Sequence, residues 1–295
     1  MGNVAAQPVR GHLAMLLFSV LVAGSFALGS LAANLIAPSA LNAVRFWAAT
    51  AIVGVAMLAT SGPPKFGPGA IWRFPVLGGL FSSYFVLMFE GLKTAPPVSA
   101  AAVFTLTPIM SGVFGWLLLR QHLSRRILAG LTIGATGALW VIFRADLNAL
   151  LAFEVGRGEI TYFWGCVAHA IYTPLVLFLR RGESAVQQTF GTLVAGSVIL
   201  TLWGWSDIRA TMWLELPGIV WVTIIYVAIF ASAATFVLLQ FAVRHIPASK
   251  VMAYTFLVPS WVLVWSIVLG SGWPSAVVLV GVGLTIAALL WLLKA

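Results

Sequence analysis

The sequence predicts an all-α integral membrane protein with ten transmembrane helices arranged as two inverted five-helix repeats. Three observations lead to this prediction. The 295 residues are 61% hydrophobic and only 8% charged, with a mean hydropathy of +1.05. The apolar residues form ten runs of membrane-spanning length, and a proline-containing phrase recurs about half a chain apart.

The composition excludes an ordinary soluble domain, which is about 45–50% apolar and about 25% charged. In water, such a chain would expose large apolar patches. The net charge of +9 does not indicate nucleic acid, because the basic residues are scattered in short pairs and form no stripe. A single cysteine, Cys166, excludes an intramolecular disulfide framework and a multi-cysteine metal site. We therefore expect membrane lipid around the chain, and no nucleic acid, metal or cofactor.

The ten helices are expected where apolar runs of about 20 residues, the length that crosses the hydrocarbon core, stand between polar, glycine or proline residues. The first run lacks a basic leader and a cleavage motif, so it is interpreted as an uncleaved span. Continuous runs also argue against a membrane barrel, whose strands are short and alternating. The expected helices cover 12–33, 40–60, 70–92, 98–119, 125–144, 159–179, 185–204, 215–242, 249–269 and 274–293.

The positions of lysine and arginine support this count, because cytoplasmic loops carry an excess of both. With ten spans and a cytoplasmic amino terminus, 11 of them lie inside and 4 outside, and Arg45 lies just within the second span. The inside set is Arg10, Lys65, Arg73, Arg120, Arg125, Arg126, Arg180, Arg181, Arg244, Lys250 and Lys294. The outside set is Lys93, Arg144, Arg157 and Arg209. We expect a multi-pass protein of a bacterial-type inner (plasma) membrane, with both termini cytoplasmic.

The recurring phrase relates the two halves of the chain. "PPVSAAAVFTLTP" begins at Pro96, and "IPASKVMAYTFLVP" begins at Ile246. Pro97, Ser99 and Thr105 recur 150 residues later as Pro247, Ser249 and Thr255, and Pro108 recurs after 151 as Pro259. Because five spans are an odd number, the second repeat (158–295) enters the membrane from the side opposite to the first (1–146). Inverted repeats with matching helix interruptions are a plan of secondary transporters, whose substrate site lies near the midplane.

Prolines interrupt the spans at matching places. A proline removes a backbone donor and bends a helix, and in lipid the freed carbonyl needs a partner or a wet cavity. Pro108 and Pro259 lie near mid-span, with the hydroxyls of Thr105 and Thr107 nearby. Because the interruption recurs, we expect a hinge or cavity role rather than a static kink, and Pro174 is a third hinge candidate.

Polar residues mark one face of the sixth span, "YFWGCVAHAIYTPLVLF". They stand three and four residues apart and therefore share a helix face: Tyr162, Cys166, His169, Tyr172 and Thr173. A histidine at mid-bilayer depth is costly, so His169 is either functional or hydrogen-bonded to a neighbouring helix. The third span adds serines and a tyrosine. The predicted substrate-path residues are His169, Tyr172, Tyr162, Tyr84, Ser82, Thr105, Thr107 and Tyr254.

Two further patterns have simpler interpretations. Arg45 and Glu90 lie near the predicted outer face, where long or charged side chains reach headgroups and water, so an interfacial position is favoured for both over a role in coupling. Gly130 and Gly134 of the fifth span match a small-residue pattern that begins at Gly281 in the tenth. Such patterns permit close helix approach. They predict contact between the repeats or a homodimer, so the protein is expected to be a monomer or a homodimer.

With these motifs the chain resembles the drug/metabolite transporter superfamily, in its EamA-type branch of ten helices in two inverted repeats. The resemblance is carried by Pro38, Arg45, Ser99, Ala100, Ala101, Pro108, Gly130, Gly134, Gly137, Ser249, Pro259 and Gly281. That branch often has a glutamate after the fourth and ninth spans, where this chain has Gln121 and Ser271. YddG-type exporters of aromatic and other neutral amino acids also lack these acids, although an aromatic residue tends to stand where this chain has His169.

The leading functional prediction is a secondary transporter that moves a small metabolite by alternating access. A phosphate or nucleotide-sugar would need convergent basic residues at midplane, and a polyvalent cation would need carboxylates; neither is evident. A neutral amphipathic solute fits better. The resemblance implies amino acids, aromatic ones included, or analogues, with the protein as exporter or facilitator. Proton-coupled export stays open as an alternative, with His169 as the titratable group.

Other classes of function find less support in the sequence. A membrane-embedded enzyme is not expected, because the four histidines are far apart and six of the seven acids lie at or beyond the predicted outer face. A receptor or assembly protein without transport is kept as an alternative from another class. Flux that depends on a small-molecule substrate distinguishes it from a transporter.

Overall fold

The computed structural model describes residues 6–63, 67, 71–120, 124–143, 146, 148, 155–242, 245–246, 248–270, 273 and 276–294. Within these ranges every regular element is a helix, and nine segments are long and apolar enough to cross a membrane. A shorter apolar helix, Val278–Lys294, lies where the tenth span was expected. The predicted all-α membrane fold is confirmed. Several positions used above lie outside the described residues: Lys65, Gln121, Arg144, Arg244, Pro247, the Ser249 side chain and Ser271.

The helices follow the predicted spans closely. The first half contains α1 (Ala6–Ala32), α2 (Pro38–Thr60), α3 (Arg73–Gly91), α4 (Pro97–Phe104), α5 (Thr107–Leu119) and α6 (Arg125–Ile142). The second contains α8 (Arg157–Phe178), α9 (Ala185–Trp203), α10 (Trp205–Ala210), α11 (Gly218–Ala228), α12 (Thr235–Ala242), α13 (Ala248–Ala253), α14 (Val258–Val268) and α15 (Ala276–Lys294). A π-helical segment, Ile229–Ala234, joins α11 to α12, and 3₁₀ turns occupy Trp213–Glu215 and Tyr254–Leu257.

Local sequence sets several helix ends. Pro38 and Pro97 open α2 and α4, where the missing backbone N–H has no helical partner to lose. Ser184 and Gln187 form a reciprocal capping box at the start of α9. Helix α5 ends at Leu119 and is capped by Arg120, whose φ of 52° places it in the left-handed region. These start and stop signals keep each membrane span near the length that crosses the hydrocarbon core.

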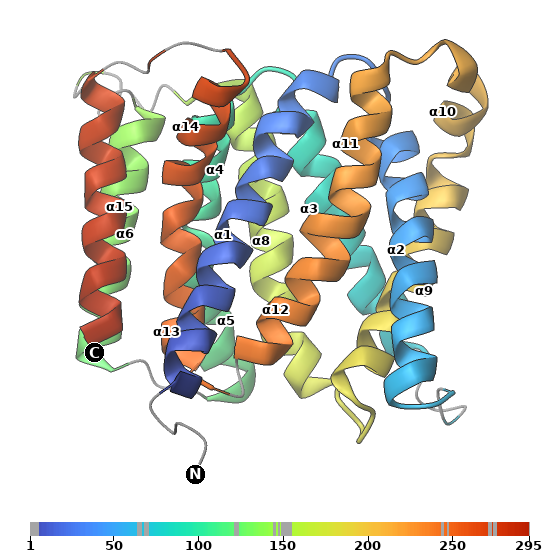
Figure 1. Cartoon of the computed structure of the whole chain (residues 1–295), viewed down its shortest axis with the longest axis horizontal. Coiled ribbons are helices and arrows are strands. Elements are labelled where there is room, and N and C mark those ends of the chain that lie inside the picture. Colours follow the sequence, from blue (N-terminus) through green and yellow to red (C-terminus); the bar gives the residue numbers. More distant parts are fainter. Residues whose placement is uncertain are drawn as a thin grey trace.

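Figure 1 shows the inverted arrangement. The interrupted span α4–α5 runs in one direction through the molecule, and the interrupted span α13–α14 runs in the other. Helix α1 begins at the same end of the molecule as α15 finishes. The matching breaks are also built alike, because Thr105 Oγ1 donates to Ala102 O and Thr255 Oγ1 donates to Met252 O, each at 2.7 Å. Each threonine hydroxyl thus bonds the carbonyl three residues before it, at matching positions of the two breaks.

Glycines bring helices of the two halves into close contact. A Cβ at Gly137 in α6 would lie 2.9 Å from Gly281 O in α15, and one at Gly91 in α3 would lie 2.7 Å from Gly158 O in α8. Gly130 likewise faces the side chain of Leu292. The small-residue pattern therefore serves contact between the halves of one chain, which was one of the two expected uses.

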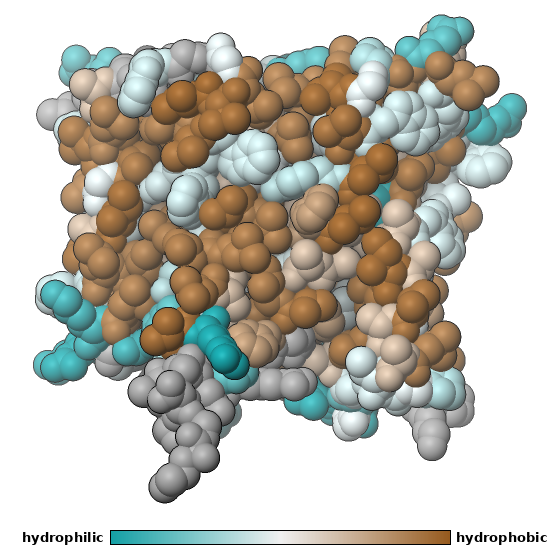
Figure 2. Space-filling view, in the orientation of Figure 1, coloured by the Kyte–Doolittle hydropathy of each residue, from teal (hydrophilic) through white to brown (hydrophobic). Residues whose placement is uncertain are grey.

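The outer surface is apolar across the middle and more polar at both ends. Figure 2 shows hydrophobic residues over most of the visible face, with hydrophilic ones gathered at its two ends. Glu90 is exposed near the end of α3, and its Oε2 accepts a hydrogen bond from Lys93 Nζ at 2.7 Å. The interfacial interpretation of Glu90 is consistent with this position.

Candidate functional site

A central cavity of about 360 Å³ lies between helices of both halves. Its walls combine aromatic rings with hydroxyl and amide groups. The rings belong to Phe18, Phe81, Tyr84, Phe85, Phe104, His169, Tyr172 and Phe236. The polar groups belong to Ser25, Thr107, Thr173, Gln188, Thr189, Thr192, Ser232, Thr235 and Thr255. Among the lining residues that the structure describes, none is Asp, Glu, Lys or Arg.

The cavity extends from mid-bundle toward the end where α1 begins and α15 finishes. Its lining reaches Ala185, the first residue of α9 at that end (Figure 1). Toward the other end the bundle is closed by Phe26 and Tyr162, which are both fully buried. The Phe26 ring centroid lies 5.8 Å from that of Tyr162 and 5.9 Å from that of Phe104. The cavity therefore approaches the end of the bundle where α1 begins, and packed aromatic rings lie toward the other end.

A buried polar pair ties the closed end together. Ser99 Oγ, near the start of α4, donates to Glu159 Oε1 in the first turn of α8 at 2.8 Å, and Glu159 is only 5% exposed. Ser39 of α2 donates similarly to Asp207 of α10. Because a buried carboxylate is costly without partners, the bond to Glu159 holds α4 against α8, whereas Asp207 is exposed.

The predicted face of the sixth span forms one wall of the cavity. His169 and Tyr172 line it, together with Tyr84 from α3 and Thr107 at the start of α5. Tyr162 stands one layer behind and donates from Oη to Tyr84 Oη at 3.0 Å. The spacing of polar residues in the sequence thus identified side chains that the structure brings together.

Three predicted residues lie elsewhere. Ser82 Oγ donates to Gly79 O within α3. Thr105 Oγ1 donates to Ala102 O at the break between α4 and α5. Tyr254 shares a 3.0 Å hydrogen bond with His12 Nδ1 near the end of the bundle at which α1 begins. None of these three lines the central cavity. Polarity within a span marked them, but polarity alone does not tell which helix face points inward.

An aromatic cluster surrounds His169. Its ring centroid lies 4.6 Å from that of Tyr84 and 6.0 Å from that of Tyr172, and Phe81 stacks on Tyr172 at 4.9 Å. His169 Nδ1 is buried and has no hydrogen-bond partner among the described residues. The expectation that His169 bonds a neighbouring helix finds no support at this nitrogen, which leaves a polar group beside the cavity for a ligand or water.

Arg45 is not interfacial, contrary to the expectation from its place in the sequence. It is fully buried, and its guanidinium lies over the Phe85 ring, 3.7 Å from the centroid. Nε and Nη2 donate to Ser232 Oγ at 3.3 and 3.1 Å. The place of Arg45 along the helix gives its depth in the membrane but not the direction of its side chain. The side chain points into the bundle.

Sequence reasoning also missed part of the cavity wall contributed by α9 and the π-helical segment. Gln188, Thr192, Ser232 and Thr235 line the cavity. The three- and four-residue spacing of Gln188 and Thr192 and of Ser232 and Thr235 was the available signal. The π-helical turn that turns Ser232 inward has no comparable sequence signature.

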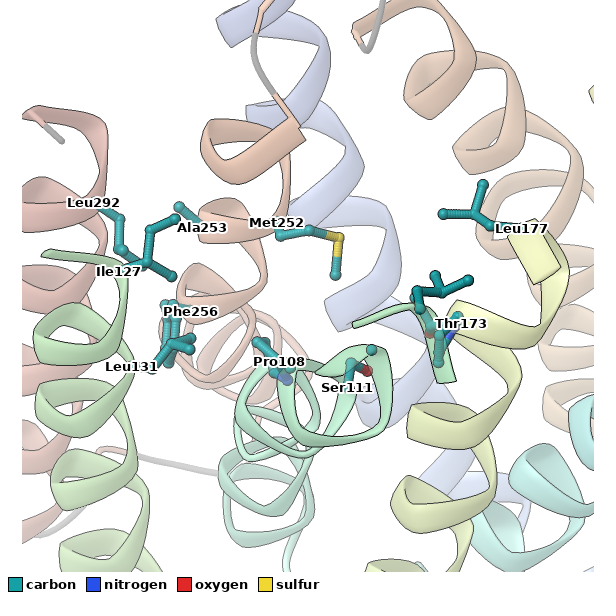
Figure 3. Close-up of a pocket in the computed structure, with 14 residues that line it drawn as sticks. Pro108, Ser111, Ile127, Leu131, Thr173, Leu177, Met252, Ala253, Phe256 and Leu292 are labelled. Atoms are coloured by element: carbon teal, nitrogen blue, oxygen red, sulfur yellow. The ribbon is translucent and has the colours of Figure 1, made fainter. Parts of the chain in front are cut away.

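A second, smaller pocket of about 200 Å³ lies beside α5. Figure 3 shows it flanked on one side by Ile127 and Phe256 and on the other by Thr173 and Leu177. Pro108 lines both this pocket and the central cavity. Helix α5 therefore has open space next to the break at which it begins.

No group of His, Cys, Asp and Glu suited to a metal ion occurs in the part of the chain that the structure describes.

Comparisons with known proteins agree with this architecture. The EamA-like transporter family matches residues 9–143 and 156–294. The uncharacterized transporter YyaM of Bacillus subtilis (strain 168) is 25% identical over 264 residues, which are 88% of this chain and 86% of that protein. The uncharacterized transporter YvbV of the same organism is 26% identical over 180 residues, 60% of this chain and 56% of that protein.

A solved structure described only as a crystal structure of a protein shares the fold. Its TM-score is 0.66 at 20% identity, and the alignment covers 97% of this chain and 96% of that one. Because the identity is low, this similarity concerns the fold alone. The two family matches together span most of the chain, one in each half. The protein is a multi-pass membrane protein and belongs to the EamA-like transporter family.

Proposed function

We propose that the protein is a secondary transporter that moves small, overall neutral amphipathic metabolites through the central cavity by alternating access. The observation that carries the proposal is the cavity itself. It has rings and hydroxyls on its walls and no ionised lining residue among those described, and its lining reaches Ala185, at the end of the bundle where α1 begins. Its volume of about 360 Å³ falls in the range of small-molecule sites, about 300–1,000 Å³.

Amino acids, aromatic ones included, or their analogues are the substrate class that we propose, with the protein acting as an exporter or facilitator. Stacked rings at Phe81, Tyr172 and His169 suit an apolar or aromatic body. The hydroxyls and amides around them suit a polar group. The resemblance to YddG-type exporters, which rests on the missing acids after the fourth and ninth spans, supports the same class.

The repeats 1–146 and 158–295 would move against each other about the interrupted spans. Pro108 and Pro259 open α5 and α14 directly after the breaks, whereas Pro174 lies within the continuous helix α8. The side pocket leaves room next to α5. We therefore assign hinge roles to Pro108 and Pro259 first. The excess of lysine and arginine on one side supports a cytoplasmic location for both termini.

Exchange across proteoliposome membranes tests transport directly. Vesicles loaded with unlabelled phenylalanine should take up external labelled phenylalanine by counterflow, and empty vesicles without protein should not. Uptake that is the same with and without a pH gradient indicates a facilitator, and uptake only with a gradient indicates proton coupling, for which His169 is the candidate. Absence of flux for a broad series of amino acids and amphiphiles contradicts the proposed function.

Replacement of His169 tests the site. His169→Ala removes a ring that lines the cavity, and a contact between this ring and an aromatic solute would be worth about 0.5–1.5 kcal/mol. The initial rate of uptake should therefore fall about threefold to tenfold, while the yield and elution profile of the purified protein stay unchanged. His245→Ala, outside the cavity, is the matched control. Equal rates for His169→Ala and the wild type remove His169 from the site.

Ligand binding without flux is the result that favours the alternative class, a membrane receptor or assembly protein. Such a protein needs a pocket but no second opening. Counterflow separates the two, because a receptor gives a saturable binding signal in detergent and no exchange in sealed vesicles.

A further inference from the structure

Arg45 is a cation held at the closed end of the central cavity with part of its guanidinium unused. The residue is 0% exposed. Nε and Nη2 donate to a single oxygen, Ser232 Oγ, and the guanidinium plane lies over the Phe85 ring. Nη1 is buried and has no hydrogen-bond partner among the described residues.

Among the residues that the structure describes, no carboxylate pairs with Arg45 to balance its charge. An arginine stays protonated in proteins, and a buried charge without a partner is strongly unfavourable. The ion pairs formed within the described ranges join Arg73 to Glu183 and Lys93 to Glu90. The Ser232 hydroxyl and the face of the Phe85 ring therefore occupy the positions around the guanidinium where a counter-ion is expected.

The two groups that cover Arg45 are themselves cavity walls. Ser232 and Phe85 both line the cavity, and the guanidinium lies directly behind them. Ser232 sits in the π-helical segment Ile229–Ala234 and donates its own proton to Val227 O at 2.7 Å. Such π-helical turns occur frequently at functional sites, because they re-aim a side chain within a helix.

We propose that the closed end of the cavity is a carboxylate-binding subsite, formed by Arg45 and Ser232. On binding, the Ser232 hydroxyl turns its proton from Val227 O to the ligand, and the guanidinium donates charge-assisted bonds to the same carboxylate. The body of the ligand then lies toward the rings of Phe81 and Tyr172. The substrate class is a monocarboxylate with an aromatic or apolar body.

This inference rests on the proposed function and changes its substrate class in one respect: the solute must carry a carboxylate, and it is neutral overall only where an ammonium group accompanies that carboxylate. Amino acids qualify through their carboxylate, but an ammonium group is not required, because no described lining residue is Asp or Glu. Binding of the negative group supplies the counter-charge that Arg45 lacks. A ligand with an ammonium group and no carboxylate would add a second cation near Arg45 and is excluded from the class.

Three probes of one shape test the subsite in the full chain, purified in detergent: 3-phenylpropionate, 3-phenylpropionamide and phenethylamine. Dissociation constants are read from the ligand-dependent rise of the thermal unfolding midpoint. The wild type should bind the carboxylate about 10- to 100-fold more tightly than the amide, as hydrogen bonds to a charged group imply. The amine should bind more weakly than the amide.

Arg45→Gln should reduce the preference for carboxylate over amide to about onefold, and Arg209→Gln, an exposed arginine outside the cavity, should keep it. Because the ratio compares two ligands on one protein, a moderate loss of stability does not affect it. If Arg45→Gln does not fold, Ser232→Ala is the second test, because it keeps the cation and removes the hydroxyl. The preference of this variant for carboxylate over amide should fall severalfold. Equal affinity of the wild type for acid and amide, or an unchanged preference in either variant, overturns the subsite.

Failure of the subsite and failure of transport are distinguishable. A wild type that binds the carboxylate selectively but shows no counterflow contradicts the proposed function and keeps the subsite. A wild type that exchanges the amide and the carboxylate equally well contradicts the subsite and keeps the transporter.

Discussion

At the residue scale, the sequence predicts side chains that are unusual for their depth and misses those that depend on direction. His169 and Tyr172 were identified because polar residues at helical spacing stand out in an apolar span. Arg45 was misplaced, because its number in the helix gives its depth but not whether it faces lipid or the bundle interior. Ser232 was missed because a serine among alanines in an apolar helix is unremarkable until a π-helical turn directs it inward.

The ion pair between Arg73 and Glu183 gives a pH-dependent prediction. Their atoms Nη1 and Oε1 are 2.7 Å apart, and the side chains are 3% and 6% exposed. Burial alone would raise the pKa of the Glu183 carboxyl, but backbone hydrogen bonds from Glu183 and Arg181 and the Arg73 guanidinium outweigh it and lower this pKa below its ordinary value. The pair therefore stabilises the fold most when Glu183 is ionised.

Glu183→Gln should lower the thermal unfolding midpoint by a few degrees at pH 7, because it removes a charge-assisted bond worth about 1.5–3 kcal/mol. The difference from the wild type should be complete above the ordinary glutamate pKa of about 4.3 and should vanish as the pH falls through the lowered pKa. Glu90→Gln, from an exposed pair, is the control and should change the midpoint little. A difference that does not depend on pH would contradict the assignment.

At the element scale, helix ends were predicted to within a few residues, since proline, glycine and charge mark where apolar runs stop. Helix α1 is the exception and begins at Ala6 rather than near residue 12. Helix α10 and the 3₁₀ turn Trp213–Glu215 were not predicted, because short amphipathic turns at the interface have no periodicity long enough to recognise. The sequence left two roles for the glycines, contact between the repeats or contact between two chains. The structure shows contact between α6 and α15 within one chain.

Close packing of α6 on α15 predicts opposite outcomes for two neighbouring glycines. A Cβ at Gly281 would lie 2.9 Å from Gly137 O, a backbone atom that cannot move away by itself, whereas a Cβ at Gly283 meets nothing within 4 Å. Gly281→Ala should therefore destabilise the protein by about 1–3 kcal/mol. Gly283→Ala should be neutral or should stabilise by up to about 1 kcal/mol through helix propensity.

Thermal unfolding midpoints of the two variants, measured in one detergent, check this prediction. The account requires a lower midpoint for Gly281→Ala than for Gly283→Ala. Equal midpoints, or dissociation of a dimer in the Gly281 variant, would mean that these glycines face another chain rather than α6.

At the scale of the whole molecule, the recurring proline phrase predicted the essential architecture. Two oppositely directed interrupted spans, with the same threonine bonds at their breaks, follow from one repeated sequence. The sequence predicts that a cavity lies between the halves, but not which residues line it. Its walls come from many helices, and the rotation of each helix about its axis depends on packing. The closed end, where Arg45 lies, depends on contacts between residues almost 190 positions apart in the chain.

Two-sided access to one mid-membrane position tests the central claim most directly. Cys166→Ser gives a cysteine-free chain, and Thr192→Cys then places one thiol on the cavity wall. Val55→Cys, on the exposed apolar surface, is the control that should resist a hydrophilic reagent from either side. The account predicts that an impermeant thiol reagent modifies the Thr192→Cys protein from each face of the membrane in turn, at rates that substrate shifts in opposite directions. Modification from one face only, whatever the substrate concentration, would contradict it.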